Sequence, residues 1–210
     1  MKEARIIALL IATAASAEDS VERATAALAA AAIERARPYT AFQNAEIVKG
    51  FERFPALAEA YLAASASPDD TDARAKAFAA LDAETRTSPD GRFLEAMFGA
   101  APDSSPQQIA LLEECANSSP EHVLSRFHLG RVFRKSDPTK AERIARELIL
   151  IHPAGYGMLS DLLHMRGDLD GEIEATRAFI KAGGAPDLGI PASMAEEKLP
   201  ALLAKQNAEL

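Results

Sequence analysis

The sequence predicts an all-α fold, a right-handed solenoid of about five antiparallel helix pairs closed by a C-terminal capping helix. Proline spacing is the first reason, because five of the prolines, about every second one in this region, stand at intervals of 34, 31, 33 and 33 residues, the period of two-helix repeats. The second reason is the abundance of alanine, the best helix former, in the stretches between them. The five prolines are Pro55, Pro89, Pro120, Pro153 and Pro186.

Helix starts are expected where a capping residue stands directly before a proline. A serine or aspartate side chain accepts a hydrogen bond from a free N–H of the first turn, and proline suits the first helical position, where its missing N–H costs nothing. Five such pairs mark segment boundaries in this chain. They are Ser67-Pro68, Ser88-Pro89, Ser105-Pro106, Ser119-Pro120 and Asp137-Pro138.

Composition and charge exclude several classes of protein. The chain of 210 residues is 48% hydrophobic and 26% charged, which is typical of a globular domain with a continuous core. Its net charge of −8 argues against a nucleic-acid partner, because phosphate binding requires a basic face. One cysteine, Cys115, cannot form an intramolecular disulfide, and the four histidines lack metal-site spacing. We therefore expect no cofactor and no metal.

Residues 1–17 are predicted to be a cleaved export signal. A start with net charge +1 precedes an apolar run from Ile6 to Ala15, and Ala15-Ser16-Ala17 matches the small-x-small pattern of a signal-peptidase site. The run is too short to anchor the chain stably across a bilayer. We therefore expect a periplasmic or secreted protein without a membrane span. The alternative is a cytoplasmic solenoid whose N-terminal helix packs on or caps the repeats.

Residues 18–190 are expected to hold the helical repeats. Apolar side chains recur at helical spacing between the boundaries, for example Ile47, Val48 and Phe51. In the first part of this region the expected helices pair in order along the chain. They are Glu18–Arg37 with Gln43–Phe54, Pro55–Ala64 with Asp70–Arg86, and Arg92–Ala100 with Pro106–Asn117. The capping helix is expected within residues 191–210, where Ser193 and Glu196 have capping-box spacing.

A known repeat motif is matched in the second half of the chain. The first matching unit contains the segment Phe127-His-Leu129-Gly130-Arg-Val-Phe133, followed after a turn by Ala141, Ala145, Leu148 and Pro153. The next unit contains Tyr156, Leu159, Ser160, Leu163, Arg166-Gly167-Asp168-Leu169, Ile173 and Phe179. Residues 121–185 therefore resemble the tetratricopeptide repeat family. This chain departs from the pattern at Glu172 and Thr176, where the family prefers alanine and an aromatic residue. The resemblance places Gly130 where the two helices of its repeat cross.

The resemblance also implies a binding surface on the concave side of the repeats. Carried onto the Leu129-Gly130 register, that surface holds Phe127, Arg131, Arg134 and Lys135, with Asp161 and His164 in the next unit. Its cations are unexpected in an acidic chain, and would suit an acidic peptide or a free C-terminal carboxylate. The alternative is that they pair with neighbouring acids such as Asp137 and Glu142.

The predicted function is a non-catalytic adaptor or scaffold that binds a protein or peptide segment in the groove, in the bacterial envelope. One alternative is an assembly chaperone for an envelope enzyme complex. A second alternative is an enzyme that uses groove residues around His164 and Asp161. No nucleophile, base and orienting group stand at plausible spacing, so the sequence favours binding over catalysis.

Overall fold

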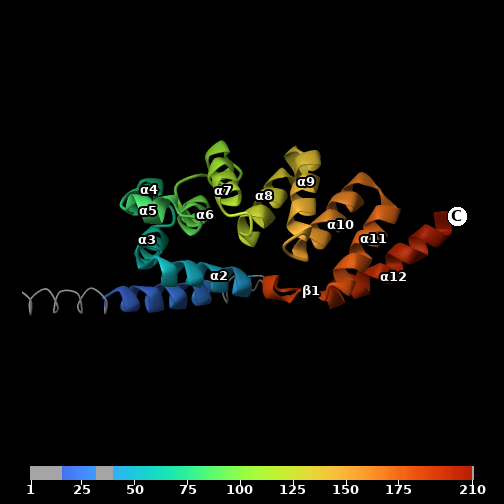
Figure 1. The fold of residues 1–210 in the computed structure, drawn as a ribbon, viewed down its shortest axis with the longest axis horizontal. Coiled ribbons are helices and arrows are strands. Elements are labelled where there is room, and N and C mark those ends of the chain that lie inside the picture. The colour runs from blue at the N-terminus through green and yellow to red at the C-terminus, as the bar shows by residue number, and fades with distance from the viewer. Residues whose placement is uncertain (1–15, 32–39, 210) are drawn as a thin grey trace, which may run out of the picture. The chain divides into compact units, whose positions relative to one another are not determined.

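The computed structural model describes residues 16–31 and 40–209, and the predicted all-α class is confirmed there (Figure 1). Residues 16–31 are helical. Helices α2 to α7 follow at Thr40–Arg53, Pro55–Ala66, Thr71–Ala79, Ala83–Thr87, Pro89–Phe98 and Pro106–Ser118. Helices α8 to α12 span Val123–Ser136, Pro138–Ile149, Ala154–Arg166, Leu169–Lys181 and Ala192–Glu209.

A short antiparallel hairpin interrupts the helices between α11 and α12. Strand β1, Gly184–Ala185, pairs with β2, Ile190–Pro191, and the 3-10 turn η1, Pro186–Leu188, connects them. Gly183 and Gly184 have φ values of +83° and +76°, a left-handed conformation that glycine adopts without strain. Helix α11 ends just before these glycines, and the hairpin that follows has no counterpart in the sequence prediction.

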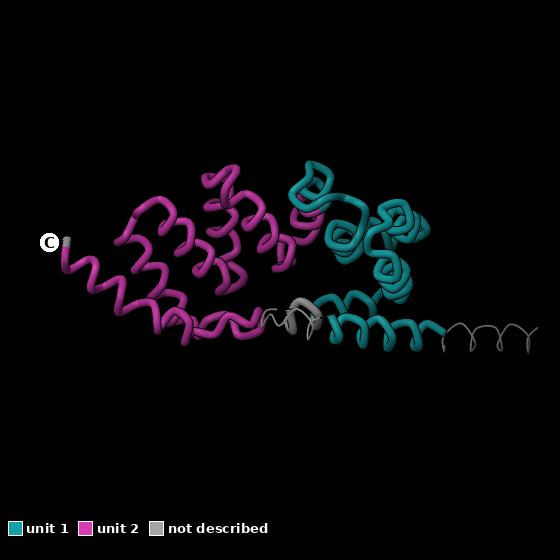
Figure 2. The backbone as a smooth tube through the Cα atoms, turned by 180° about the vertical axis from the view of Figure 1, so that it is seen from behind, with its two compact units in different colours: residues 1–37, 44–111 teal, residues 38–43, 112–210 magenta. Residues whose placement is uncertain are grey.

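The chain divides into two compact units (Figure 2). Unit 1 comprises residues 1–37 and 44–111, and unit 2 comprises residues 38–43 and 112–210. In unit 1, α3 packs against α4 and α6, and α5 packs against α6. The Tyr61 ring lies between two other aromatic rings, with centroids 5.6 Å from Phe51 and 4.9 Å from Phe98. All three elements that supply these rings therefore share one core.

The expected single helix Asp70–Arg86 is wrong, because the chain breaks it into α4 and α5. Asp82 causes the break: its carboxylate accepts hydrogen bonds from the Thr85 N–H at 2.9 Å and from the Thr85 hydroxyl at 2.7 Å. These bonds start a new helix at Ala83, because an aspartate side chain competes with the helical hydrogen bonds of its own backbone.

Three of the five predicted proline-preceded caps are confirmed. Ser88, Ser105 and Asp137 accept hydrogen bonds from the N–H groups of Gly91, Gln108 and Lys140 at 3.0, 3.2 and 3.0 Å. Two are wrong. Ser67 is the last residue of the turn that ends α3, and Asp70 caps α4. The helix expected at Ser119-Pro120 begins at Val123 instead, because the His122 Nδ1 accepts the Ser125 N–H at 3.1 Å.

The helices of unit 2 pack in chain order, each from α8 to α11 against the next, and α8 also contacts α10. The backbones of α9 and α10 approach each other closely at Gly155 in α10, where a Cβ atom would stand 2.5 Å from the Ile149 nitrogen and 2.6 Å from the Ala145 oxygen of α9. Gly130 was expected to face the other helix of its own repeat. Its nearest neighbour is instead the Met158 thioether of α10, while Ile144 of α9 lies 3.6 Å from the position of a Cβ.

Helix α12 follows α11 and packs against it, as expected of a terminal helix. The expected capping box is wrong, because Ser193 is the second residue of the helix and not the residue before it. None of the described helices is long and apolar enough to cross a membrane. Most of the predicted export signal, residues 1–15, lies outside the described residues.

Candidate functional site

Unit 2 contains a pocket of about 320 Å³, which we call the unit 2 pocket. Helices α8, α10, α11 and α12 and strand β2 contribute to its wall, so residues up to 71 positions apart in the sequence meet there. The lining residues are Phe127, Gly130, Arg131, Arg134, Ala154, Gly157, Met158, Ser160, Asp161, Thr176, Phe179, Ile190, Met194, Ala195 and Lys198.

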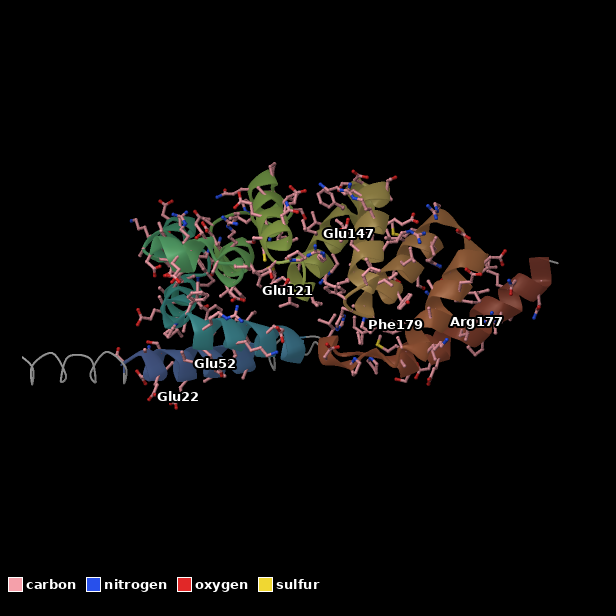
Figure 3. All side chains as sticks on the ribbon, in the orientation of Figure 1. Glu22, Glu52, Glu121, Glu147, Arg177 and Phe179 are labelled. Atoms are coloured by element: carbon pink, nitrogen blue, oxygen red, sulfur yellow. The ribbon has the colours of Figure 1, made fainter. Side chains whose placement is uncertain are left out.

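Apolar side chains make most of the wall. Phe179, labelled in Figure 3, is only 3% exposed, whereas Met194 is 59% exposed and therefore offers apolar surface to the solvent side. Small residues leave the space between them: Gly157, for example, carries no side chain where a Cβ would lie 3.6 Å from the Phe179 ring. A cavity with such walls can hold an apolar side chain of a ligand.

Three cations and one carboxylate also line the pocket. The Arg131 guanidinium lies 6.0 Å from the centre of the Phe127 ring, a cation–π distance. Arg134 is 3.9 Å from the Asp161 carboxylate, and the two side chains are 42% and 60% exposed, so this ion pair is weak. The lining therefore has a surplus of positive charge.

Two buried hydroxyl groups are also part of the lining. Ser160 in α10 and Thr176 in α11 are 5% and 2% exposed, and their oxygens are 3.0 Å apart. The Thr176 hydroxyl also donates to the Glu172 carbonyl oxygen of its own helix at 2.7 Å. Because both residues are almost fully buried, we call them the polar floor of the pocket, whereas Arg131 is exposed and Arg134 is half-buried.

A buried carboxylate, that of Glu172, contacts side chains of two helices that line the pocket. The Glu172 side chain is 3% exposed, lies 2.6 Å from the Lys198 ammonium of α12, and hydrogen-bonds to the His164 Nδ1 of α10 at 3.0 Å. Burial alone would raise the pKa of the Glu172 carboxyl, but the hydrogen bonds and charges of Lys198 and His164 outweigh it and lower the pKa below 4.5. The ionised carboxylate thus holds α10, α11 and α12 together.

The structure brings four of the six predicted site residues to the pocket, namely Phe127, Arg131, Arg134 and Asp161. Lys135 is exposed and does not line it. His164 does not line it either and bonds to Glu172.

The alternative in which the cations pair with Asp137 and Glu142 is not seen for Arg134, whose acidic neighbour is Asp161. Glu142 instead bonds to Arg146 and Arg166, at 2.6 and 2.9 Å.

Sequence reasoning missed Met194, Lys198 and Ser160 as pocket residues. Thr176 was noticed only as a departure from the family pattern, and that departure is the signal that could have found it, because a small residue there leaves room for the pocket. Nothing local marks Lys198, since its place depends on how α12 folds back on α11.

Two histidines outside the pocket have structural contacts. His152 bonds through Nε2 to Asp187 at 2.7 Å. Burial of His128 and the charge of Arg131 lower the pKa of its imidazole to about 4, so the ring is neutral at pH 7. In the part of the chain that the structure describes, no three His, Cys, Asp or Glu side chains are grouped so that they could hold a metal ion.

A second hollow of about 590 Å³ lies along one face of α9. It is wide and shallow because a single helix lines it, and its charged side chains are paired among themselves: Arg146 with Glu142 at 2.6 Å and Arg143 with Glu147 at 3.9 Å. Unlike the unit 2 pocket it has no buried floor and no surplus charge, so it is the weaker candidate for a binding site.

No family model, curated protein or solved structure matches this chain significantly. The resemblance to tetratricopeptide repeats therefore depends on the residues of segment 121–185 themselves.

Proposed function

We propose that this chain is a non-catalytic adaptor or scaffold that binds an acidic peptide segment in the unit 2 pocket. One observation carries the proposal: a concave, largely apolar pocket has a surplus of cations in its lining, although the whole chain has a net charge of −8. Charge that served only for solubility would not gather positive groups around an apolar hollow in an acidic protein.

The pocket has the two parts that peptide recognition needs. Its wall of Phe127, Phe179 and Met194 can desolvate one apolar anchor side chain. Arg131 and Arg134 stand beside it and can contact carboxylates on either side of the anchor, with the fork geometry that makes arginine effective in such pairs. Affinity would come from the anchor, and the preference for acidic segments from the arginines.

The proposal includes the repeat architecture of the helices. Packing of α8 to α12 in chain order supports a right-handed, tetratricopeptide-like solenoid in which α12 is the terminal cap. About five helix pairs would then make up residues 18–190. We also propose that the protein acts in the bacterial envelope, on the strength of the predicted signal in residues 1–17.

Reversal of charge at Arg131 and Arg134, which we call the rim of the pocket, tests the proposal. The probe is the fluorescein-labelled peptide Glu-Glu-Phe-Glu-Glu, acetylated and amidated at its ends, with fluorescence anisotropy as the measurement. The double variant Arg131→Glu with Arg134→Glu should bind it at least about tenfold more weakly than the parent chain. Binding by the parent should also weaken as salt is added, because exposed charges are screened.

The matched control is Arg177→Glu with Lys181→Glu. It makes the same change of charge on exposed residues of α11 that do not line the pocket. This control should bind like the parent chain. Equal binding by the two double variants, with unchanged helicity in circular dichroism, would move the binding site away from the unit 2 pocket.

A further inference from the structure

We infer that the unit 2 pocket selects an anchor side chain that ends in a hydrogen-bond donor, and that its ligand is an acidic peptide segment with a tyrosine in the pocket. This inference rests on the proposed function and adds the identity of the anchor. It follows from where the hydrogen atoms of two hydroxyl groups must lie.

The hydroxyl hydrogen of Thr176 is committed to its own helix. Its oxygen is 2.7 Å from the Glu172 carbonyl oxygen, and a carbonyl oxygen can only accept. Thr176 therefore has no hydrogen left for its second neighbour. Because the Ser160 and Thr176 oxygens are 3.0 Å apart, the hydrogen between them must come from Ser160.

The polar floor of the pocket consequently presents acceptors only. Both hydroxyl hydrogens are used, while Ser160 keeps two lone pairs and Thr176 keeps one. A ligand that displaces water from these oxygens must donate a hydrogen bond to them, or leave them unsatisfied at a cost. A carbonyl or carboxylate of the ligand would meet lone pairs there. Acceptor and anionic groups of the ligand are suited instead to the guanidinium groups of Arg131 and Arg134.

Tyrosine fits this arrangement of walls, floor and rim. Its ring is apolar and can pack against Phe127 and Phe179, and its phenol carries a hydrogen-bond donor that the Ser160 and Thr176 oxygens can accept. A pocket of about 320 Å³ can take one such side chain. The surplus of positive charge at the rim suits acidic residues on both sides of the tyrosine.

The test compares two peptides that differ by one oxygen atom, acetyl-Glu-Glu-Tyr-Glu-Glu-amide and its phenylalanine counterpart, by titration calorimetry with the full chain. We expect the tyrosine peptide to bind about tenfold more tightly, because phenylalanine leaves the buried acceptors unpaired. In Ser160→Ala with Thr176→Val the floor is apolar, so the preference should disappear while the phenylalanine peptide binds at least as well as before.

Thr176→Ser is the matched control, because it keeps both hydroxyl groups and should keep the preference. Equal affinity of the two peptides for the parent chain, with binding still dependent on Arg131 and Arg134, would overturn the choice of anchor and leave the proposed function standing. A tyrosine preference that persists in the apolar-floor variant would also overturn it. Binding of neither peptide to the parent chain would overturn both proposals.

Discussion

His152 and Asp187, 35 positions apart, are joined by a hydrogen bond of 2.7 Å between the imidazole Nε2 and a carboxylate oxygen. The other ring nitrogen, Nδ1, accepts the Ala154 N–H at 3.2 Å, so the hydrogen of the neutral ring must sit on Nε2 and be donated to Asp187. The bond ties the turn between α9 and α10 to η1. Ile190 of β2 and Met194 in the first turn of α12 line the unit 2 pocket and follow η1 in the chain.

The first prediction concerns this tie. His152→Ala should destabilise the fold by about 1 kcal/mol and speed amide hydrogen exchange at Leu188, the fully buried last residue of η1. His152→Gln keeps a side-chain N–H donor and should recover part of the protection. Unchanged exchange at Leu188 in the alanine variant would show that the hairpin is held by its packing alone.

The second prediction ranks three glycine-to-alanine variants by their loss of stability. Gly155→Ala should cost about 1–3 kcal/mol, because the new methyl group would meet backbone atoms of α9 that cannot move aside. Gly130→Ala should cost less, because the group it meets is the flexible end of Met158.

Gly184→Ala should also cost more than Gly130→Ala, although Gly184 lies between helices, because Gly184 has a φ of +76° and a Cβ there would lie 2.4 Å from the Ala192 nitrogen. Urea unfolding of the three alanine variants measures the ranking. A Gly130 variant that is less stable than the Gly155 variant would contradict it.

The third prediction is a dependence of stability on pH. Since the folded pKa of Glu172 lies below its ordinary value of 4.5, the carboxylate contributes stability above that value, and the contribution is lost as the pH falls through the folded pKa. Glu172→Gln should therefore be less stable than the parent chain near pH 7 and should lose less stability between about pH 5 and about pH 3. Urea midpoints at the three pH values measure this.

The control for that experiment is Glu174→Gln, an exposed residue of the same helix. It should follow the parent chain at all pH values. If the Glu172 variant lost as much stability between about pH 5 and about pH 3 as the parent chain does, Lys198 and His164 would not stabilise the ionised carboxylate.

The fourth prediction concerns processing. A cleaved signal of residues 1–17 would leave Glu18 as the first residue of the mature protein. N-terminal sequencing of the protein from an envelope fraction should then begin at Glu18. Recovery of the intact Met1 terminus from a soluble cytoplasmic fraction would contradict the export prediction.

The sequence by itself determined the class of the fold and many of its boundaries. Ser88 and Asp137 cap helices as predicted because a cap needs only one side chain and an N–H three residues later. The break between α4 and α5, which the sequence prediction missed, also has a local cause. Asp82 with Thr85 has the same spacing as the correct caps, but the apolar run around it hid the break between α4 and α5.

The tertiary structure decided most of the site. Phe127, Arg131 and Arg134 could be grouped in advance because they lie about one turn apart on α8. Lys198 could not, because the energy that holds it near the pocket comes from Glu172, 26 positions earlier, and only the folding of α12 onto α11 brings the two charges within 2.6 Å. The direction of the Ser160 hydroxyl was equally hidden, since it depends on a threonine of another helix. Local hydrogen bonds and helix periodicity involve residues a few positions apart, so they can be predicted from the sequence. Burial and charge pairing act between any segments that the fold brings together, so they cannot.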